Sequence, residues 1–520
     1  MATELGLKRL AWPAATIASA ICLFVAYLAQ SIAGAPVNSD GASNALQAWD
    51  MLHGNLLLHG WTMSDVSFYT TELPEYMLVE TFRGLGPDVV HIAGALTYTL
   101  LVLLAGLLAM GRATSREALT RALIAAGIML APQLGNATHV LLLSPDHVGT
   151  GVPVLVAWII MERAAQTSRV APVVVGLLLA WTAVGDPVTE VVAALPLAAV
   201  CAGRAYRAVM VRREPLAACR HELSLAAAAV LSVPAASLAT RLIAASGGWT
   251  ISPVRSTFAG SGAWLHNLTL TCQGLLQLFG ADFTSLPVGH LALFAIFHLT
   301  GFGLVIWALC RTGRRFATAG LLAQVLTAAI AVNLAAYLFT VQAQNITTTR
   351  EIAAVLPFGA VLAGRQLAGP LLAARLAPVM AGVLAVYGGM LASNAVQPPL
   401  PVPAQDLTVW LAEHDLTHGL AGYWQASSIT LDSRDTVQVR AVAASRGVLA
   451  SQSYWEASRA WYDPATQYAD FIVSMDAARN WADQTLVRQM EAQAGRPAEV
   501  YRFGPYTIAV WHRNLLTRLR

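Results

Sequence analysis

The sequence predicts an α-helical polytopic membrane protein with about eleven transmembrane helices, followed by a C-terminal extracytoplasmic mixed α/β domain. The first observation is composition: the 520 residues are 56% hydrophobic and only 12% charged, whereas soluble domains carry roughly 25% charged residues. The second is that apolar runs of about 20 residues, the length that crosses a bilayer, recur up to residue 394 and then stop. A net charge of +3 without a long basic run gives no reason to expect a nucleic-acid partner.

The apolar runs give the expected order of spans. They lie at 10–32, 90–110, 122–141, 149–161, 170–184, 188–203, 223–245, 286–310, 317–340, 352–367 and 376–393. The first run is longer than the apolar core of a signal peptide, so we interpret it as an uncleaved span. Several later runs are short, which is tolerated where a helix faces protein or a water-filled cavity instead of lipid.

The distribution of basic residues predicts the orientation. With the N-terminus in the cytoplasm, the external segments before residue 394 hold four arginines: Arg83, Arg241, Arg255 and Arg350. The other basic residues of this region then lie on the cytoplasmic side, as the positive-inside rule requires. The abundance of alanine and the single lysine, Lys8, suggest a bacterial chain. We therefore expect a bacterial plasma-membrane protein whose C-terminal domain is extracytoplasmic.

The same reading divides the chain into domains. Residues 1–394 form the expected transmembrane domain, with long external segments at 33–89 and 246–285. A proline-rich linker at 395–403 follows, and proline-rich segments are stiff. Residues 404–520 form the α/β domain, with helices expected at 405–415 and 476–494. Strand-like runs at 437–442, 471–474, 499–503 and 506–511 complete it.

Asp40 is the first candidate functional residue. It lies a few residues beyond the first span, just before a helical pattern. A carboxylate that is partly desolvated at this boundary is a plausible general base. Asp is also a favoured helix N-cap, and on placement alone the two interpretations have equal weight.

The segment around Asp40 resembles the GT-C superfamily, membrane glycosyltransferases that use polyprenyl-phosphate sugars. Members typically have an acidic residue just after the first span and then a helix with the pattern A-x-x-M-x-x-G, here Ala48, Met51 and Gly54. The resemblance implies a GT-C-like transmembrane domain in which Asp40 deprotonates the acceptor hydroxyl. Many members have two adjacent acids at this point, whereas Gly41 follows Asp40 in this chain.

A second match begins at residue 347, in the segment TTTREIAAVLPFGAVLAGR. Several GT-C families have an arginine before an apolar "LP" helix at the start of a late span. The resemblance implies that Arg350 holds the donor phosphate, and paired guanidinium hydrogen bonds suit that role. The alternative is an interfacial arginine that pairs with Glu351.

Two external turns hold further candidates for the sugar or metal site. Asp146 and His147 adjoin a glycine-rich turn, and His139 precedes them by about two helical turns. In the enzymes that the chain resembles, the second external loop contributes acids to the sugar or metal site. The alternative is that Asp146 only stabilises the turn and that His147 faces solvent. Glu190 lies one helical turn after Asp186 near the membrane edge, where ionisable groups are functional candidates.

The C-terminal domain has its own candidates for contacts with the acceptor. His418, Tyr423 and Trp424 lie in a segment rich in polar and aromatic groups. Such domains are often appended to glycosyltransferases of this type for acceptor or sugar recognition. Packing in the domain core is the alternative explanation for these aromatic side chains.

Together these residues lead to one functional hypothesis and two alternatives. The resemblance implies inverting transfer of a sugar from a polyprenyl-phosphate donor to a glycan, lipid or protein acceptor in the cell envelope, with a divalent metal such as Mg or Mn left open. Membrane lipids are the other expected partners. A catalytically silent GT-C-like scaffold or lipid-binding protein is the main alternative. A secondary transporter is less well supported, because the chain has no convincing inverted repeat.

Overall fold

The computed structural model describes residues 2–143, 146–254, 256–283, 290–400, 403–445, 447–475 and 485–520. They form two compact units. Unit 1 comprises 1–35, 94–238 and 255–399, and unit 2 comprises 36–93, 239–254 and 400–520. Residues 401–402 of the predicted linker and 476–484 of the predicted helix at 476–494 lie outside the described residues. The predicted domain boundaries at 394 and 404 stay a prediction.

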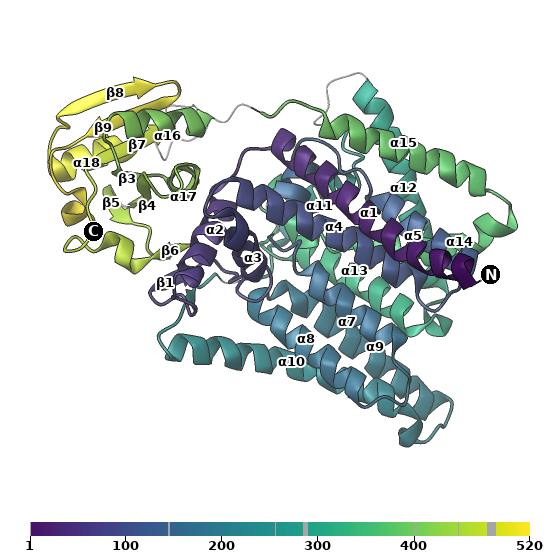
Figure 1. The fold of residues 1–520 in the computed structure, drawn as a ribbon. Helices are drawn as coiled ribbons and strands as arrows, with labels where there is room; N and C mark the ends of the chain where they lie inside the picture. The colour runs from purple at the N-terminus through teal and green to yellow at the C-terminus, as the bar shows by residue number, and fades with distance from the viewer. Residues whose placement is uncertain are drawn as a thin grey trace. The chain divides into compact units, whose positions relative to one another are not determined.

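Unit 1 is a bundle of helices (Figure 1). Its longer helices are α1 (Ala2–Gly34), α5 (Ser115–Met129), α7 (Gly151–Arg163), α8 (Val170–Gly185), α9 (Leu195–Tyr206), α11 (Trp264–Leu278), α12 (His290–Arg314), α13 (Leu321–Phe339), α14 (Val355–Ala373) and α15 (Ala377–Ala395). Helices α4 (Asp88–Met110) and α10 (Arg220–Ala245) each contribute residues to both units. Short helical turns connect them: α6 (Asn136–Thr138), η1 (His139–Leu143), η2 (Glu190–Ala194), η3 (Arg207–Val211), η4 (Leu216–Cys219), η5 (Ser261–Ala263), η6 (Phe316–Thr318) and η7 (Ile346–Ile352).

Among the described residues, eight helices are long and apolar enough to cross a membrane. They are Ala14–Gly34, Asp88–Met110, Glu190–Val211, Leu216–Ala245, Phe294–Arg314, Leu321–Phe339, Val355–Ala373 and Ala377–Ala395. The other three predicted spans coincide with α5, α7 and α8, which have 15, 13 and 16 residues. The predicted span at 122–141 is not one helix, because α5 ends at Met129 and the chain turns before η1. The chain is a multi-pass membrane protein, and the count of eleven spans stays a prediction.

Helix α5 illustrates how a short helix is held inside the bundle. At Gly364 of α14, a Cβ atom would lie 2.5 Å from the backbone carbonyl oxygen of Arg121 in α5. Glycine therefore allows the two backbones to approach closely, as small residues do between membrane helices. Because α5 packs against protein at this point, it does not need the full length of a lipid-facing span.

Unit 2 combines residues 36–93 and 239–254 with the C-terminal residues. Its helices are α2 (Ser39–Leu52), α3 (Leu73–Arg83), α16 (Pro403–Glu413), α17 (Tyr423–Asp432), η8 (Arg459–Tyr462), α18 (Leu486–Ala494) and η10 (Leu515–Arg518). Its strands are β1 (Trp61–Met63), β2 (Thr250–Ile251), β3 (His418–Ala421), β4 (Gln438–Ser445), β5 (Val448–Ser451), β6 (Ala457–Ser458), β7 (Phe471–Met475), β8 (Glu499–Phe503) and β9 (Tyr506–Val510). The four predicted strand runs correspond to β4, β7, β8 and β9.

A six-stranded mixed sheet organises the C-terminal residues (Figure 1), in the order β5-β4-β3-β7-β9-β8. Strand β3 is parallel to β4 and β7, and the remaining pairs are antiparallel. Side chains alternate between the two faces of a strand. Accordingly, Phe471 and Val473 of β7 pack with Leu407 of α16, whereas Ile472 packs with Met490 of α18. Both faces of the sheet are therefore covered by helices.

A small second sheet holds separate segments of unit 2 together. Its central strand β1 pairs with β2 in parallel and with β6 in the antiparallel sense. In register, Thr62 lies opposite Thr250 on one side and Ala457 on the other. This pairing fixes the turn that precedes β6, which carries Glu456.

Candidate functional site

The imidazole of His147 forms the centre of a charged cluster in unit 1. Its Nδ1 lies 3.0 Å from Oδ2 of Asp186, and its Nε2 lies 3.3 Å from Oε1 of Glu351. A neutral imidazole has only one N–H, whereas the protonated ring donates from both nitrogens. Burial alone would lower the pKa of His147, but the carboxylates of Glu351 and Asp186 raise it to about 10. The ring is therefore a cation at neutral pH.

Asp186 lies at the turn between α8 and η2 and is completely buried. Its Oδ2 also accepts a hydrogen bond from the Thr150 hydroxyl at 2.5 Å, and its Oδ1 accepts one from the backbone N–H of Val188 at 2.9 Å. Burial alone would raise the pKa of Asp186, but His147 and these donors hold it below its ordinary value. In the structure Asp186 both stabilises the turn, through the N–H of Val188, and forms an ion pair with His147.

Arg350 and Asp146 form a second pair beside His147. Arg350 lies in η7, and its Nη1 is 3.6 Å from Oδ2 of Asp146, whose side chain is 3% exposed. The Arg350 side chain is 36% exposed. Together with His147, Asp186 and Glu351, this pair brings three carboxylates and two cations into one cluster. We refer to these five residues as the His147 cluster.

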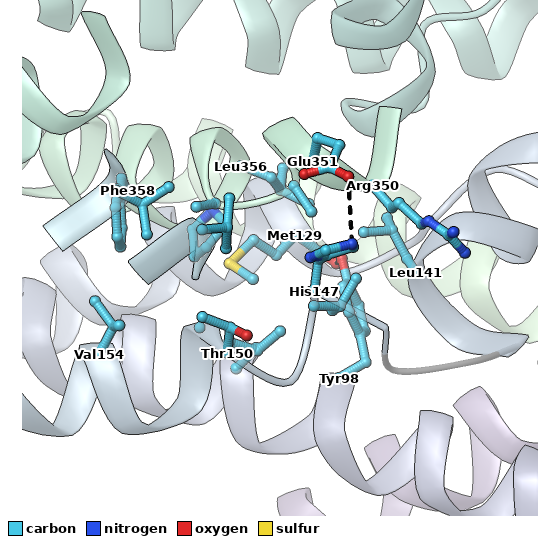
Figure 2. Close-up of a pocket in the computed structure, with 18 residues that line it drawn as sticks. Tyr98, Met129, Leu141, His147, Thr150, Val154, Arg350, Glu351, Leu356 and Phe358 are labelled. Carbon is cyan, nitrogen blue, oxygen red and sulfur yellow. Dashed lines mark hydrogen bonds and ion pairs between the residues drawn. The ribbon is translucent and has the colours of Figure 1, made fainter. Parts of the chain in front are cut away.

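A narrow pocket adjoins the His147 cluster (Figure 2). Its lining comes from α4, α5, α7 and the η7–α14 segment, and it includes Tyr98, Met129, Val154, Leu356 and Phe358. His147, Arg350 and Glu351 line it as well. In Figure 2 the imidazole of His147 is directed toward Glu351, whereas the guanidinium of Arg350 extends away from it. The predicted residues Arg350 and His147 therefore lie at one pocket.

The geometry of His147 does not suit a metal ligand. Both of its ring nitrogens are engaged by carboxylates that lie on opposite sides of the ring, and a metal ligand needs a nitrogen lone pair. In the part of the chain that the structure describes, no group of three or more His, Cys, Asp or Glu side chains is arranged to hold a metal ion.

The two other candidates of unit 1 are placed differently. His139 is half-buried at the first position of η1. Glu190 begins η2 and is exposed, whereas Val188 and Val192 of the same turn line the pocket. The structure thus brings Asp146, His147 and Arg350 together and turns Glu190 toward the surface.

A second cluster, in unit 2, is built around Asp40. Asp40 lies in the first turn of α2 and is 9% exposed. The N-cap of α2 is Asn38, whose side chain accepts a hydrogen bond from the backbone N–H of Gly41. The carboxylate of Asp40 is therefore not the capping group of this helix. It accepts a hydrogen bond of 2.6 Å from the hydroxyl of Tyr423 instead.

Tyr423 also contacts a second carboxylate. Its hydroxyl lies 2.5 Å from Oε2 of Glu456, which is 5% exposed. Burial and the carboxylates of Glu456 and Asp40 raise the pKa of Tyr423 well above its ordinary value, so the phenol keeps its proton. We refer to Asp40, Tyr423 and Glu456 as the Asp40 cluster. Tyr423 was predicted as an acceptor contact, and Glu456 was not predicted at all.

His418 and Trp424 lie outside the Asp40 cluster. His418 begins β3, where its Nδ1 is 2.9 Å from the Thr417 hydroxyl. Trp424 is 56% exposed and packs edge-on against Tyr423, with ring centroids 5.1 Å apart. An exposed indole can stack on a sugar ring, so the prediction for Trp424 as an acceptor contact stays open.

This chain has a fold similar to that of solved structures. It resembles the crystal structure of ArnT from Cupriavidus metallidurans bound to undecaprenyl phosphate, with a TM-score of 0.53 and 12% identity over 96% of this chain and 98% of that one. The apo state of the same protein matches with a TM-score of 0.42 and 14% identity, over the same shares of both chains. An Archaeoglobus fulgidus oligosaccharyltransferase in complex with Zn and sulfate matches with a TM-score of 0.47 and 10% identity, over 89% of this chain and 69% of that one. No protein-family model and no curated protein sequence matches the chain.

Proposed function

We propose that this protein is an inverting glycosyltransferase that moves a sugar from a polyprenyl-phosphate donor to an acceptor in the cell envelope. The observation that supports it best is the similarity of fold to ArnT, which extends over 96% of the chain. That structure of ArnT is bound to undecaprenyl phosphate, and a lipid of the same class fits a multi-pass protein. The protein would work in a bacterial plasma membrane, with its N-terminus in the cytoplasm and its C-terminal residues outside.

Asp40 is the proposed general base. A base must reach the proton that it abstracts, and Asp40 follows the first span directly, where a lipid-linked donor and an external acceptor meet. The acceptor oxygen attacks the anomeric carbon, Asp40 takes the hydroxyl proton, and the bond from that carbon to the phosphate oxygen breaks. Attack from the face opposite the departing phosphate inverts the anomeric centre.

Arg350 is the proposed phosphate-binding residue. Its side chain is 36% exposed, and the 3.6 Å between its Nη1 and Oδ2 of Asp146 is longer than a good hydrogen bond. A phosphate can therefore reach this side chain and make paired, charge-assisted hydrogen bonds with it. The leaving phosphate needs neutralisation in the transition state, and a positioned cation provides it.

The remaining predicted residues take substrate-binding roles in this proposal. His147 lines the pocket beside Arg350, and Asp146 pairs with Arg350; both would bind sugar hydroxyls, with His139 and Glu190 as weaker candidates. His418 and Trp424 would contact the acceptor. A divalent metal and the identity of the sugar stay open in this proposal.

Transfer of radiolabelled sugar from a panel of polyprenyl-phosphate donors in membranes tests the proposal. The comparison is between the wild type, Asp40→Asn and Asp65→Asn, which removes a half-buried acid of the same external segment. We expect transfer by the wild type and by Asp65→Asn, and none by Asp40→Asn at equal expression. No transfer from any donor would favour the catalytically silent scaffold instead.

A further inference from the structure

A long groove lies between α8 and α10 in unit 1. It shares no lining residue with the pocket at the His147 cluster, and all of its lining residues belong to unit 1. The two helices touch within it, because a Cβ at Gly176 of α8 would lie 3.0 Å from the Cβ of Ala228 in α10. Its volume is about 1250 Å³, whereas pockets for drug-sized ligands have roughly 300–1,000 Å³. The groove therefore has room for a large ligand.

The walls of the groove are apolar and open. Val173 and Leu177 of α8 and Leu231 of α10 line it, and they are 58%, 66% and 64% exposed. On α10 the lining extends from Arg220 to Ala235, which is about 22 Å at the rise of an α-helix. One leaflet is half of the hydrocarbon core, or about 15 Å. A lipid of one leaflet can therefore place both its acyl chain and its headgroup along this groove.

One end of the groove is basic. The exposed residues Arg169 and Arg220 line it there, together with His221 and Glu222. Oε1 of Glu222 lies 3.5 Å from Nε of Arg204, so its charge is balanced within the protein. Both α8 and α10 begin at this end, where the helix dipoles add to the positive potential. The end of the groove thus favours an anion, and its walls favour hydrocarbon.

His221 provides a separate indication of a ligand at the same end. Its Nδ1 is buried, and among the described residues no group makes a hydrogen bond with it. Buried polar atoms normally have a hydrogen-bond partner, and leaving one unpaired is unfavourable. Because His221 lines the groove, the polar headgroup of a lipid can supply that partner.

We propose that the groove between α8 and α10 binds an anionic glycerophospholipid of the membrane. Its phosphate binds Arg169 and Arg220, and an acyl chain lies between the two helices. Basic pockets between membrane helices are suited to anionic headgroups. The positive-inside pattern predicts that this end faces the cytoplasm, where the leaflet is rich in anionic lipids. The site is independent of the proposed sugar transfer.

Native mass spectrometry of the purified full-length protein, freed of lipid in detergent, tests the headgroup contact. Phosphatidylglycerol should bind more tightly than the zwitterionic phosphatidylcholine. Arg169→Ala/Arg220→Ala should weaken phosphatidylglycerol binding by about 30-fold, because two cations near the headgroup are lost. Arg314→Ala/Arg315→Ala is the matched control, since it removes two exposed arginines outside the groove. Equal affinity of the wild type and both double variants would overturn the proposal, as would equal losses in the two variants.

A second pair of variants tests the acyl-chain contact without changing charge. Ala227 is exposed and lines the groove, so Ala227→Trp fills it and should abolish phosphatidylglycerol binding. Val230, 59% exposed on α10 and outside the lining, is the control, and Val230→Trp should bind like the wild type. Unchanged binding in Ala227→Trp would refute the site. A lipid-free dimer that Ala227→Trp converts to a monomer would assign the groove to a second copy of the chain and overturn the proposal.

Discussion

The imidazole of His147 makes an ion pair with Asp186, with 3.0 Å between Nδ1 and Oδ2. The two side chains are 6% and 0% exposed. Buried ion pairs bear a desolvation cost that excellent geometry and extra hydrogen bonds must offset, and here Thr150 and Val188 supply those bonds to Asp186. The pair connects the turn before α7 to the turn after α8.

The His147 pair makes stability depend on pH in the alkaline range. The pKa of His147 is raised from 6.5 to about 10. Between these two pH values the folded protein therefore keeps a proton on His147 that the unfolded chain releases. The resulting stabilisation is complete below pH 6.5 and is lost as the pH rises to about 10. We expect the thermal unfolding midpoint of the wild type to fall over this window more steeply than that of His147→Gln. Parallel curves for the two proteins would contradict the pair.

Removal of the anionic partner should destabilise the protein at neutral pH. Asp186→Asn leaves His147 without its buried counter-charge, and breaking a buried pair from one side costs about 3 kcal/mol. Glu190→Gln is the matched control, because Glu190 lies one turn further along and is exposed. Thermal unfolding in detergent should show a lower midpoint for Asp186→Asn and no change for Glu190→Gln. An unchanged midpoint in Asp186→Asn would be inconsistent with an ion pair.

Arg350 should determine donor affinity. Hydrogen bonds to a charged group contribute about 1.5–3 kcal/mol, so Arg350→Ala should raise the donor KM by about 10-fold or more. Arg350→Lys should recover only part of this loss, because lysine lacks the paired donors of a guanidinium. Arg83→Ala, at a 58% exposed arginine paired with Asp88, is the control and should leave the KM unchanged. Equal KM values for wild type and Arg350→Ala would exclude Arg350 from phosphate binding.

Two glycines of α14 test the packing of the bundle. A Cβ at Gly364 would lie 2.5 Å from the Arg121 carbonyl oxygen, whereas no described atom lies within 4 Å of a Cβ at Gly369. Gly364→Ala should therefore force α14 and α5 apart and lower the unfolding midpoint. Gly369→Ala should be neutral or slightly stabilising, since alanine is favoured over glycine in a helix by about 1 kcal/mol. Equal midpoints for the two variants would show that α5 and α14 are not in close contact.

The sequence predicted the elements of the fold well because their signals are local. Apolar runs locate helices directly, and short strand-like runs located strands such as β7 and β9 in the C-terminal residues. The predicted span at 122–141 was wrong as a single helix, because α5 packs against α14 and does not need the length of a lipid-facing span. Hydrophobicity alone does not distinguish a buried helix from a lipid-facing one.

The site was less predictable because its contacts join distant segments. Arg350 was predicted from a different segment than Asp146 and His147, and the structure brings the three together through the turn before α7 and the η7 turn. Glu456 had no recognisable sequence signal: it lies in an irregular turn, and it contacts the same Tyr423 hydroxyl as Asp40. An isolated acid in a turn is ordinary in a sequence, and its positive φ appears only in the structure.

Sugar transfer by wild type and Asp40→Asn in matched membranes is the most direct test of the central claim. The account predicts that radiolabelled sugar moves from a polyprenyl-phosphate donor to an envelope acceptor in the wild type, and that this transfer disappears in Asp40→Asn at unchanged expression. Equal transfer by the two proteins would contradict the role of Asp40 as base. No transfer by the wild type from any donor would contradict the enzyme itself.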